Sequence, residues 1–227
     1  KGKKIDGNKF ADYAIKRGAS LSIIDKNYGK RNKKKIKVKN SLNFFSQCAS
    51  QIRISSNISS IAITGSSGKT SLKEMLGRLL NKIYKTTYSN SSYNNKYGVP
   101  ISLFNIDKRD KFGVFEVGMD RSGEIDYLTK IIKPNVGVIT NISYAHIKNF
   151  KNLNGIAKAK SEIINNIVKN GTLVINADDQ FFDYLKLKAL KKNLKVISFG
   201  TKNKADIVLK KIIKLKKKTY IFINFNG

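Results

Sequence analysis

The segment Ser60-Ile-Ala-Ile-Thr-Gly-Ser-Ser-Gly-Lys-Thr-Ser71 joins a short apolar run to an amphipathic pattern. The apolar run predicts a buried strand, and the apolar residues that follow Ser71 recur at helical spacing. Gly65 and Gly68 lie in the turn, where glycine lets backbone N–H groups approach a ligand closely. The N-terminus of the following helix adds a partial positive charge. The segment therefore predicts a strand, a tight glycine turn and a helix that together hold phosphate.

Lys69 and Thr70 follow the second glycine, in the order of the Lys and Ser/Thr of a P-loop. In that role the Lys69 ammonium reaches the β- and γ-phosphates, and the Thr70 hydroxyl takes a position on Mg²⁺. Only two residues separate the glycines instead of the usual four, so the loop is a shortened one. The alternative is a plain glycine-rich turn with an exposed lysine. The expected nucleotide contacts are Gly65, Ser66, Ser67, Gly68, Lys69, Thr70 and Ser71.

The composition predicts a globular chain in a reducing, cytoplasmic location. Hydrophobic residues make up 41% of the 227 residues. The single cysteine, Cys48, excludes an intramolecular disulfide and a cysteine-based zinc site. No apolar run approaches the roughly 18 residues that span a bilayer, and no signal peptide is expected.

The charge has two interpretations. The 45 Lys and Arg against 15 Asp and Glu give a formal net charge of +30, which is typical of proteins that bind nucleic acid or an anionic membrane surface. The lysines are, however, spread along the chain, with denser runs at 33–39 and 210–218, and they accompany many Asn and Ile residues. These three residue types have AT-rich codons, so genome composition explains the charge without a partner. We expect no specific nucleic-acid partner, although a polyanionic nucleotide would be attracted.

The first part of the chain predicts a fragment of a small α/β domain. Residues 8–18 predict a helix and 21–24 a strand. The basic run at 33–39 predicts an exposed loop around a short strand, and Ser41 is expected to cap the next helix. One αβ unit is too small to bury a core alone. Because the chain also starts at Lys1 without a Met, the beginning of this domain is expected upstream.

From residue 58 onward strands and helices alternate, which predicts an α/β fold with a mostly parallel sheet and crossover helices. An antiparallel pair, 207–213 and 219–223, is expected at the end. In such a sheet ligands bind at the carboxyl ends of the strands, so the polar residues there are site candidates. Strands are expected at 60–64, 86–88, 112–117, 135–140, 172–175 and 195–199, and helices at 69–83, 98–105, 123–132, 153–168 and 179–190.

Two candidates follow apolar strands. Glu116 ends the strand at 112–117, where a carboxylate is costly unless it meets a cation or donors. It is either a Mg²⁺ ligand facing Lys69 and Thr70 or a carboxylate that pairs with a lysine or caps a helix. His146, the sole histidine, lies a few residues past the strand at 135–140. Without a second His or a nearby Cys it does not predict a zinc site, and a structural role is the alternative.

Lys160 lies on the helix expected at 153–168, three residues before Ile163 and four before Ile164, on the side toward the core. Burial beside other cations lowers the pKa of a lysine. A neutral amine can add CO₂ and become a carbamate, which inverts its charge. Lys160 is therefore a candidate for carbamylation, and a solvated surface lysine is the alternative.

Two polar segments are candidates for recognition. Asn94 and Asn95 lie in a loop that ends at Gly98-Val-Pro100, and they are either turn formers or donors to a substrate carboxylate and phosphate. Asn176 and Asp178 follow the strand at 172–175. They either contact a nucleobase or ribose, or Asp178 forms an Asx-type helix cap.

Taken together, six segments resemble the Mur ligases, most closely the D-alanyl-D-alanine-adding branch. A single motif of this length is weak, but six in the family's order are specific. Ser92 departs from the pattern, since relatives often carry a further Asn there. The segments are Ile-Thr-Gly-Ser-Ser-Gly-Lys-Thr at 63–70, Asn-Asn-x-x-Gly-Val-Pro at 94–100, Glu-Val-Gly-x-x-x-x-Gly-Glu-Ile at 116–125, Thr-Asn-Ile-x-x-Ala-His at 140–146, Ala-Lys-Ala-Lys-x-Glu-Ile at 157–163 and Asn-Ala-Asp-Asp at 176–179.

The resemblance implies an ATP-dependent amide ligase of peptidoglycan precursor synthesis. ATP phosphorylates the carboxylate of a UDP-N-acetylmuramoyl-tripeptide, and the amine of D-alanyl-D-alanine then attacks the acyl phosphate. The resemblance implies these roles: Lys69 on the phosphates, Thr70 and Glu116 on one Mg²⁺, His146 and a carbamylated Lys160 on a second, Asn176 on adenine, and Asn94 and Asn95 on the muramoyl substrate.

The family has three domains, which implies that residues 1–57 are part of the UDP-substrate-binding domain and 58–227 a C-terminally truncated ATP-binding domain. Such a chain is expected to be a monomer that binds nucleotide weakly and does not ligate. Two other interpretations stay open. One is another ligase of the superfamily, either a diaminopimelate- or lysine-adding enzyme or a folylpolyglutamate synthase. The other is a basic nucleic-acid-binding module.

Overall fold

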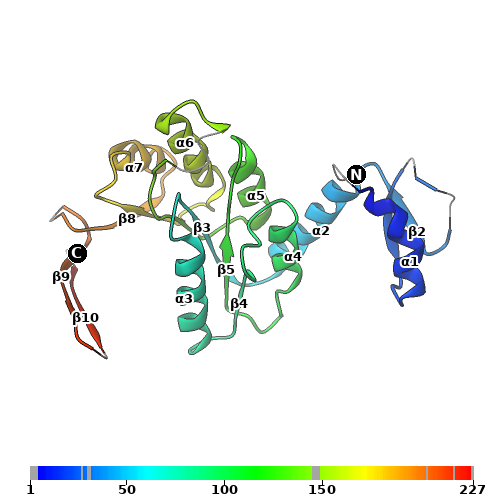
Figure 1. Cartoon of the computed structure of the whole chain (residues 1–227), viewed down its shortest axis with the longest axis horizontal. Helices are drawn as coiled ribbons and strands as arrows, with labels where there is room; N and C mark the ends of the chain where they lie inside the picture. Colours follow the sequence, from blue (N-terminus) through cyan, green and yellow to red (C-terminus); the bar gives the residue numbers. More distant parts are fainter. Residues whose placement is uncertain are drawn as a thin grey trace. The chain divides into compact units, whose positions relative to one another are not determined.

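The computed structural model describes residues 5–26, 28–29, 32–144, 149–202, 204–216 and 218–225. The chain divides into two compact units, Lys1–Cys48 and Ala49–Gly227. Helix α2, Ser41–Ser55, begins in the first unit and continues into the second (Figure 1). Within the described ranges, no helix combines the length and the apolar character needed to cross a bilayer.

The first unit is the small αβ element that its sequence predicts. It contains the 3₁₀ helix η1 (Gly7–Phe10), helix α1 (Ala11–Lys16) and the parallel strands β1 (Ser22–Asp25) and β2 (Lys35–Val38). One expectation was wrong, because Ser41 does not cap α2. The Asn40 Oδ1 accepts the Asn43 N–H at 2.8 Å, so the cap lies one residue earlier. Asn and Ser are about equally good caps, and the sequence offers both side by side.

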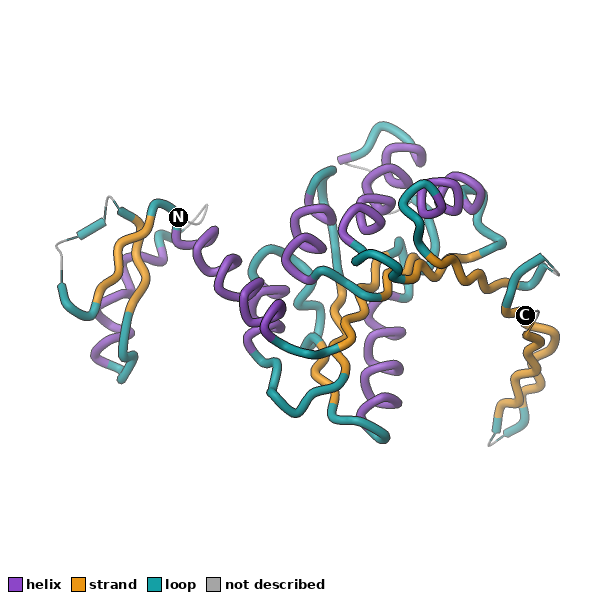
Figure 2. Tube along the Cα trace, turned by 180° about the vertical axis from the view of Figure 1, so that it is seen from behind, coloured by secondary structure: helices purple, strands orange, loops and turns teal. Residues whose placement is uncertain are grey.

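The second unit is built on an eight-stranded sheet in the order β10-β9-β8-β7-β6-β3-β5-β4. Every neighbouring pair is parallel except β9 and β10, so the mostly parallel α/β sheet is confirmed. Figure 2 shows the strands and helices of this unit. Its elements are β3 (Ser59–Thr64), α3 (Lys69–Asn81), β4 (Thr86–Tyr88), α4 (Gly98–Phe104), β5 (Phe112–Glu116), α5 (Glu124–Ile132), β6 (Val136–Ile139), α6 (Leu153–Lys160), η3 (Ser161–Asn166), β7 (Thr172–Asn176), α7 (Phe182–Leu190), β8 (Lys195–Gly200), β9 (Ile207–Lys214) and β10 (Thr219–Phe225).

Helices cover both faces of this sheet. Successive residues of a strand point to opposite faces, so neighbouring residues of β3 pack against different helices. Ile61 and Ile63 of β3 belong to a cluster with the apolar side of α3. Ala62, between them, belongs to a larger cluster with apolar residues of α4, α5, α6, η3 and α7. The inner strand β3 is therefore apolar on both sides, as is usual for a parallel sheet buried between helices.

The helix expected at 153–168 is divided in the structure. It is α-helical only as far as Lys160, and η3 continues it as a 3₁₀ helix. A lysine of α7 and one just after it bind carbonyls of this segment: Lys188 Nζ donates to Ser161 O at 3.2 Å, and Lys192 Nζ donates to Ile164 O at 3.1 Å. Helix α7 itself begins at Phe182 instead of residue 179, because Asp179 serves the preceding turn.

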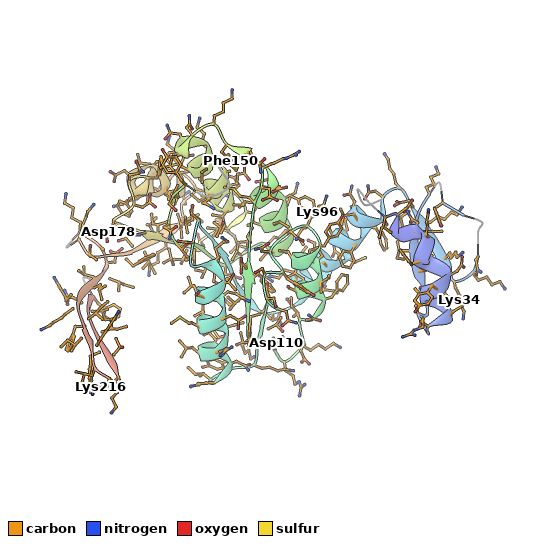
Figure 3. All side chains as sticks on the ribbon, viewed as in Figure 1. Lys34, Lys96, Asp110, Phe150, Asp178 and Lys216 are labelled. Atoms are coloured by element: carbon orange, nitrogen blue, oxygen red, sulfur yellow. The ribbon has the colours of Figure 1, made fainter. Side chains whose placement is uncertain are left out.

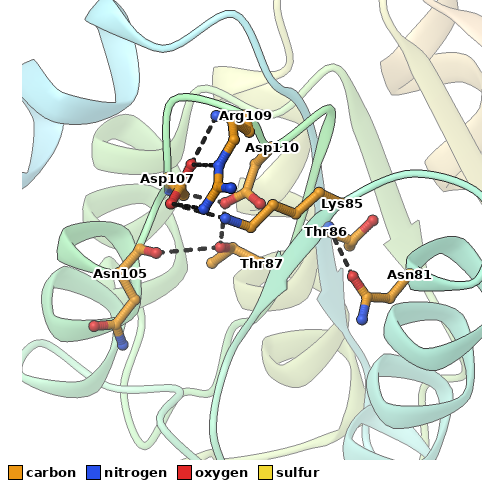
Figure 4. A network of polar contacts seen from close by, with 8 residues as sticks. All are labelled: Asn81, Lys85, Thr86, Thr87, Asn105, Asp107, Arg109 and Asp110. Carbon is orange, nitrogen blue, oxygen red and sulfur yellow. Dashed lines mark hydrogen bonds and ion pairs between the residues drawn. The ribbon is translucent and has the colours of Figure 1, made fainter.

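A polar network lies at the amino end of the sheet, where β4 and β5 begin (Figure 4). Asp107 pairs with Lys85 at 2.8 Å and with Arg109 at 3.1 Å. Asp110 accepts hydrogen bonds from the Thr87 hydroxyl and from the Asp107 N–H. The hydrogen bond from the Arg109 side chain, followed by that from Lys85, holds the pKa of Asp107 well below its usual range.

Candidate active site

The glycine turn predicted from the sequence connects β3 to α3. Gly68 precedes α3 with a φ of 78°, and Gly65 has a φ of 149°. A Cβ on Gly65 would lie 1.8 Å from the Thr140 Oγ1, so both the backbone angle and the space require glycine. The first helical hydrogen bond runs from Leu72 N to Gly68 O, at 2.9 Å. The N–H groups of the preceding residues have no intrahelical partner, and an anion can accept from them.

Lys69 folds back over this turn. Its Nζ donates to Gly65 O at 2.9 Å, which keeps the ammonium beside the loop that it would serve in phosphate binding. Ser66 and Ser67 are held from the other side. Their N–H groups donate to Asn141, to its backbone O at 2.9 Å and to its Oδ1 at 3.1 Å. These two N–H groups are used within the protein, whereas the N–H groups at the start of α3 have no intrahelical partner.

The segment that follows β6 braces the turn further. The Thr140 Oγ1 donates to Ser67 O at 2.6 Å, and the Ser66 hydroxyl donates to Ser143 O at 2.9 Å. Asp179 in turn accepts the Ile142 N–H at 2.6 Å. The carboxyl ends of β3, β6 and β7 are therefore tied together. His146 was predicted just beyond this segment and lies outside the described residues.

Glu116 is the centre of the site. It is only 1% exposed, at the end of β5. Its Oε2 accepts the Thr70 hydroxyl at 2.7 Å, and its Oε1 accepts the Asn94 amide at 2.7 Å. Three residues from three of the predicted segments thus meet through one carboxylate. The prediction that Glu116 faces the start of α3 is confirmed by this contact.

The partners of Glu116 are both neutral. In the described part of the chain it forms no ion pair with a lysine or arginine. A buried carboxylate without a cation is costly, and a carboxylate has more acceptor positions than these two donors fill. A divalent cation fits here by its chemistry: Mg²⁺ accepts hydroxyl and carboxylate oxygens and takes its other ligands from water and phosphate. No three His, Cys, Asp or Glu side chains of the described residues converge to hold a metal by themselves.

Lys160 is buried, as predicted, with an exposed fraction of 2%. Burial, together with the nearby charge of Lys69, lowers its pKa from 10.5 to about 7. The second cause places Lys160 within the electrostatic reach of the glycine turn. At neutral pH a large fraction of this amine is unprotonated and nucleophilic.

The two asparagines of the loop before α4 have different contacts. Asn94 is the donor to Glu116, and its carbonyl accepts the Gly118 N–H at 2.8 Å. Asn95 is a turn former: its Oδ1 accepts the N–H groups of Tyr97 and Gly98, each at 3.0 Å. Gly118 must be glycine for this packing, because a Cβ there would lie 2.9 Å from Asn94 Cγ.

Asn176 and Asp178 both form local turns at the end of β7. The Asn176 Oδ1 accepts the Asp178 N–H at 2.9 Å. Asp178 does not cap a helix, so that alternative was wrong. Its carboxylate accepts the Thr201 N–H at 2.7 Å and hydroxyl at 2.9 Å, and these contacts lower its pKa. Asp178 is labelled in Figure 3. The Asn176 Oδ1 is thus engaged within the protein.

Three polar residues near this site were not expected from the sequence: Asn141, Asp179 and the buried Lys73, whose Nζ donates to Ser89 O and Ser91 O. A signal existed for Lys73, since it lies three residues before Leu76 on the buried side of α3. Met75 and Leu79 are exposed instead, so the apolar pattern alone gave an incomplete picture of that helix. Asn141 and Asp179 are polar residues in loops, where sequence does not indicate which distant backbone they bind.

Comparisons with known proteins find relatives that are similar in sequence and in fold. A UDP-N-acetylmuramoyl-tripeptide–D-alanyl-D-alanine ligase of Buchnera aphidicola subsp. Baizongia pistaciae is 38% identical over 207 residues, which are 91% of this chain and 45% of that protein. A crystal structure of MurF from Acinetobacter baumannii has a TM-score of 0.91 at 30% identity and covers 100% of this chain and 49% of that one. MurF of Thermotoga maritima in complex with ADP has a TM-score of 0.88 at 29% identity, over 98% of this chain and 51% of that one.

The chain therefore spans about half the length of the relatives that it matches. The family model of the Mur ligase middle domain matches residues 63–227, which contain the glycine turn, Glu116 and Lys160. The match covers most of the second unit and more than half of the chain. The chain belongs to the Mur ligase family, and residues 63–227 form its middle domain.

Proposed function

We propose that the full-length protein is an ATP-dependent ligase that adds D-alanyl-D-alanine to a UDP-N-acetylmuramoyl-tripeptide. The observation that carries this proposal is the buried Glu116, which Thr70 at the start of α3 and Asn94 of the loop before α4 contact together. This contact brings a phosphate-binding helix start and a substrate-binding loop to one carboxylate. The names and structures of the similar proteins support the same reaction.

In this proposal the chain mainly positions charge. The free N–H groups at the start of α3 and the Lys69 ammonium hold the phosphates. Thr70 and Glu116 would hold Mg²⁺, which, when bound, neutralises charge that develops on the transferred phosphoryl group. The substrate carboxylate takes the phosphoryl group from ATP, and the amine of D-alanyl-D-alanine displaces phosphate from the acyl phosphate and loses a proton.

Lys160 would contribute through carbamylation. Its neutral amine attacks CO₂, the new carbamic acid loses a proton, and a carboxylate-like group replaces the ammonium. The burial of Lys160 and its lowered pKa support this step. The resulting anion would offset the charge of Lys69 and, with His146, would hold a second Mg²⁺. Asn176 at adenine and Asn95 at the muramoyl substrate stay predictions, as do residues 1–57 as the UDP-substrate domain, a monomeric state and a cytoplasmic location.

The test uses the full-length enzyme with ATP, Mg²⁺ and UDP-N-acetylmuramoyl-tripeptide, with release of phosphate as the readout. D-Alanyl-D-alanine is expected to support turnover, whereas diaminopimelate, lysine and glutamate are not. Lys69→Ala is expected to abolish turnover. Turnover with one of the other donors would instead assign the enzyme to another branch of the family.

The competing interpretation is a nucleic-acid-binding module. It predicts retention on DNA or RNA that falls steeply with salt and survives Lys69→Ala. We expect only weak, non-specific retention, caused by the charge of +30. The 227 residues alone are expected not to ligate, and release of ADP by them that depends on D-alanyl-D-alanine would contradict this.

A further inference from the structure

Lys73 is a buried cation that the proposed reaction does not use. It lies on α3, one turn after Thr70, and its exposed fraction is 0%. Its Nζ donates to the Glu74 carboxylate at 2.6 Å, to Ser89 O at 2.6 Å and to Ser91 O at 2.9 Å. A lysine has three donors, and all three are used. Glu74 balances the charge, so the two carbonyls can be bound without an uncompensated ammonium.

The two carbonyls belong to the segment that follows β4 and leads into the loop that carries Asn94. Ser89 is anchored to the sheet, since its N–H donates to Val114 O at 3.0 Å. Ser91 has a φ of +43°, the left-handed conformation that residues with a Cβ seldom adopt. Such a conformation persists only where the surroundings fix it. Lys73 supplies one fixed contact at this residue, through the carbonyl of Ser91.

Three residues later the same loop reaches the site. Asn94 donates to the Glu116 Oε1, and the other oxygen of Glu116 accepts from Thr70. Thr70 and Lys73 lie one helical turn apart on α3. The contacts therefore close a ring from Thr70 along the helix to Lys73, through Ser91 to Asn94, and through Glu116 back to Thr70. The first turn of α3 is therefore connected to both hydrogen-bond donors of Glu116: it contains Thr70, and it reaches Asn94 through Lys73 and Ser91.

We propose that Lys73 is a positioning residue for the acceptor substrate: by fixing the left-handed backbone at Ser91, it holds Asn94 against Glu116. This inference rests on the proposed function, in which Asn94 contacts the muramoyl substrate and Glu116 the metal. It predicts a specific effect on the kinetics. Loss of Lys73 should weaken the acceptor side of the reaction more than the ATP side, because Lys69 and the free N–H groups of the glycine turn remain in place.

The test compares Lys73→Met, Ser91→Gly and the double variant in the full-length enzyme. Lys73→Met is expected to raise the KM and the calorimetric Kd of UDP-N-acetylmuramoyl-tripeptide by about 10- to 100-fold, the usual effect of losing an outer support. The KM for ATP is expected to change much less. Ser91→Gly alone should be close to wild type, because glycine takes the left-handed conformation freely. In the double variant Ser91→Gly should restore most of the lost affinity.

Ser91→Val is the second variant, and it keeps the proposal testable if Lys73→Met does not fold. Ser91 is exposed, so valine adds no clash, but a β-branched residue disfavours positive φ. The acceptor KM should rise while Lys73 is intact. A merely structural role predicts that Lys73→Met lowers Tm and leaves the ratio of the two KM values unchanged, and that Ser91→Gly does not rescue it; either result overturns the proposal. If the wild-type enzyme does not ligate at all, the proposed function fails first, and that failure is visible before any variant is compared.

Discussion

Each end of the sheet carries a network of carboxylate and threonine side chains, but among the described residues only the network at the amino end contains basic side chains. At the amino end, Asp107 pairs with Lys85 and Arg109, and Thr87 donates to the neighbouring Asp110. At the carboxyl end, Glu116 meets only a hydroxyl and an amide. The first network contains its own cations, Lys85 and Arg109. The second leaves negative charge for a cation from outside, and this is the difference between a structural network and a binding site.

Glu116→Gln is the strongest way to break this comparison. Glutamine keeps the size and one acceptor oxygen but removes the charge, so kcat should fall by about 10²- to 10³-fold, as for loss of a group that stabilises developing charge. Stability without ligands should not fall, because an uncompensated buried charge is removed. Steady-state kinetics over a range of Mg²⁺ concentrations and thermal unfolding check the two parts. Asp107→Asn is the matched control, and equal losses of activity in both variants would refute the distinction.

Gly65→Ala tests the geometry of the carboxyl end. The new Cβ would lie 1.8 Å from Thr140 Oγ1, so the turn must move. A displacement of about 1 Å in a positioning loop can cost about 10²-fold in kcat/KM. Gly123→Ala is the control, since its φ of 87° strains alanine similarly but nothing lies within 4 Å of the added Cβ. Kinetics with ATP as the varied substrate should separate the two variants, and similar ATP kinetics for both would count against the crowding at Thr140.

Much of this site could be predicted because its parts are local. The alternation of strands and helices fixes a parallel sheet, and a parallel sheet brings Thr70 and Glu116 to the same end although they are 46 residues apart. The supports could not be predicted in this way. The Asn141 Oδ1 binds a backbone N–H 74 residues away, and Asp179 binds one 37 residues away. Loop polar residues have many possible partners, and only the folded chain selects one.

The ends of helices were the other feature that the sequence did not predict. Asn40 and Ser41 are both good caps, and local preference does not decide between them. The change from α6 to η3 after Lys160 accompanies contacts with Lys188 of α7 and with Lys192 just after it, which no pattern within 153–168 contains. Sequence patterns therefore gave the elements and most of their order, whereas tertiary hydrogen bonds set where they end.

The lowered pKa of Lys160 predicts that the stability of the protein depends on pH. Its folded pKa of about 7 lies below its usual 10.5, so the unfolded chain binds the extra proton between these values. Stability should therefore rise as the pH rises from about 7 to 10.5, and the cost of burial should be complete below about 7. Lys160→Met should remove this slope and stabilise the protein at pH 6 by on the order of 2 kcal/mol. Denaturant unfolding without bicarbonate measures this, and an unchanged slope would show that Lys160 is not the titrating group.

Carbamylation of the same lysine gives a separate readout. With ¹³C-bicarbonate, a carbamate signal is expected that grows as the pH rises through about 7 at constant dissolved CO₂, because the neutral amine is the reactive form. Lys160→Met should lack the signal. A signal that persists in this variant would assign the modification to another amine.

Asp107→Asn should have the smallest effect. The contacts with Arg109 and Lys85 lower the pKa of Asp107, so its contribution to stability is complete above its usual value of 3.8 and is lost as the pH falls from there through the lowered folded value. The wild-type chain and the variant should differ slightly in Tm at pH 7 and converge at low pH. Because the Asp107 side chain is partly exposed, added salt should reduce the difference. A large loss of ligase activity in this variant would contradict a purely structural role.

The most direct test is a crystal structure of the full-length protein with a non-hydrolysable ATP analogue and Mn²⁺, whose anomalous signal locates the metal. We expect a peak at about 2.0–2.3 Å from a Glu116 carboxylate oxygen and from the Thr70 Oγ1, next to the phosphates at the start of α3. A bound nucleotide whose metal lies elsewhere, with Glu116 still accepting from Thr70 and Asn94 alone, would contradict the account.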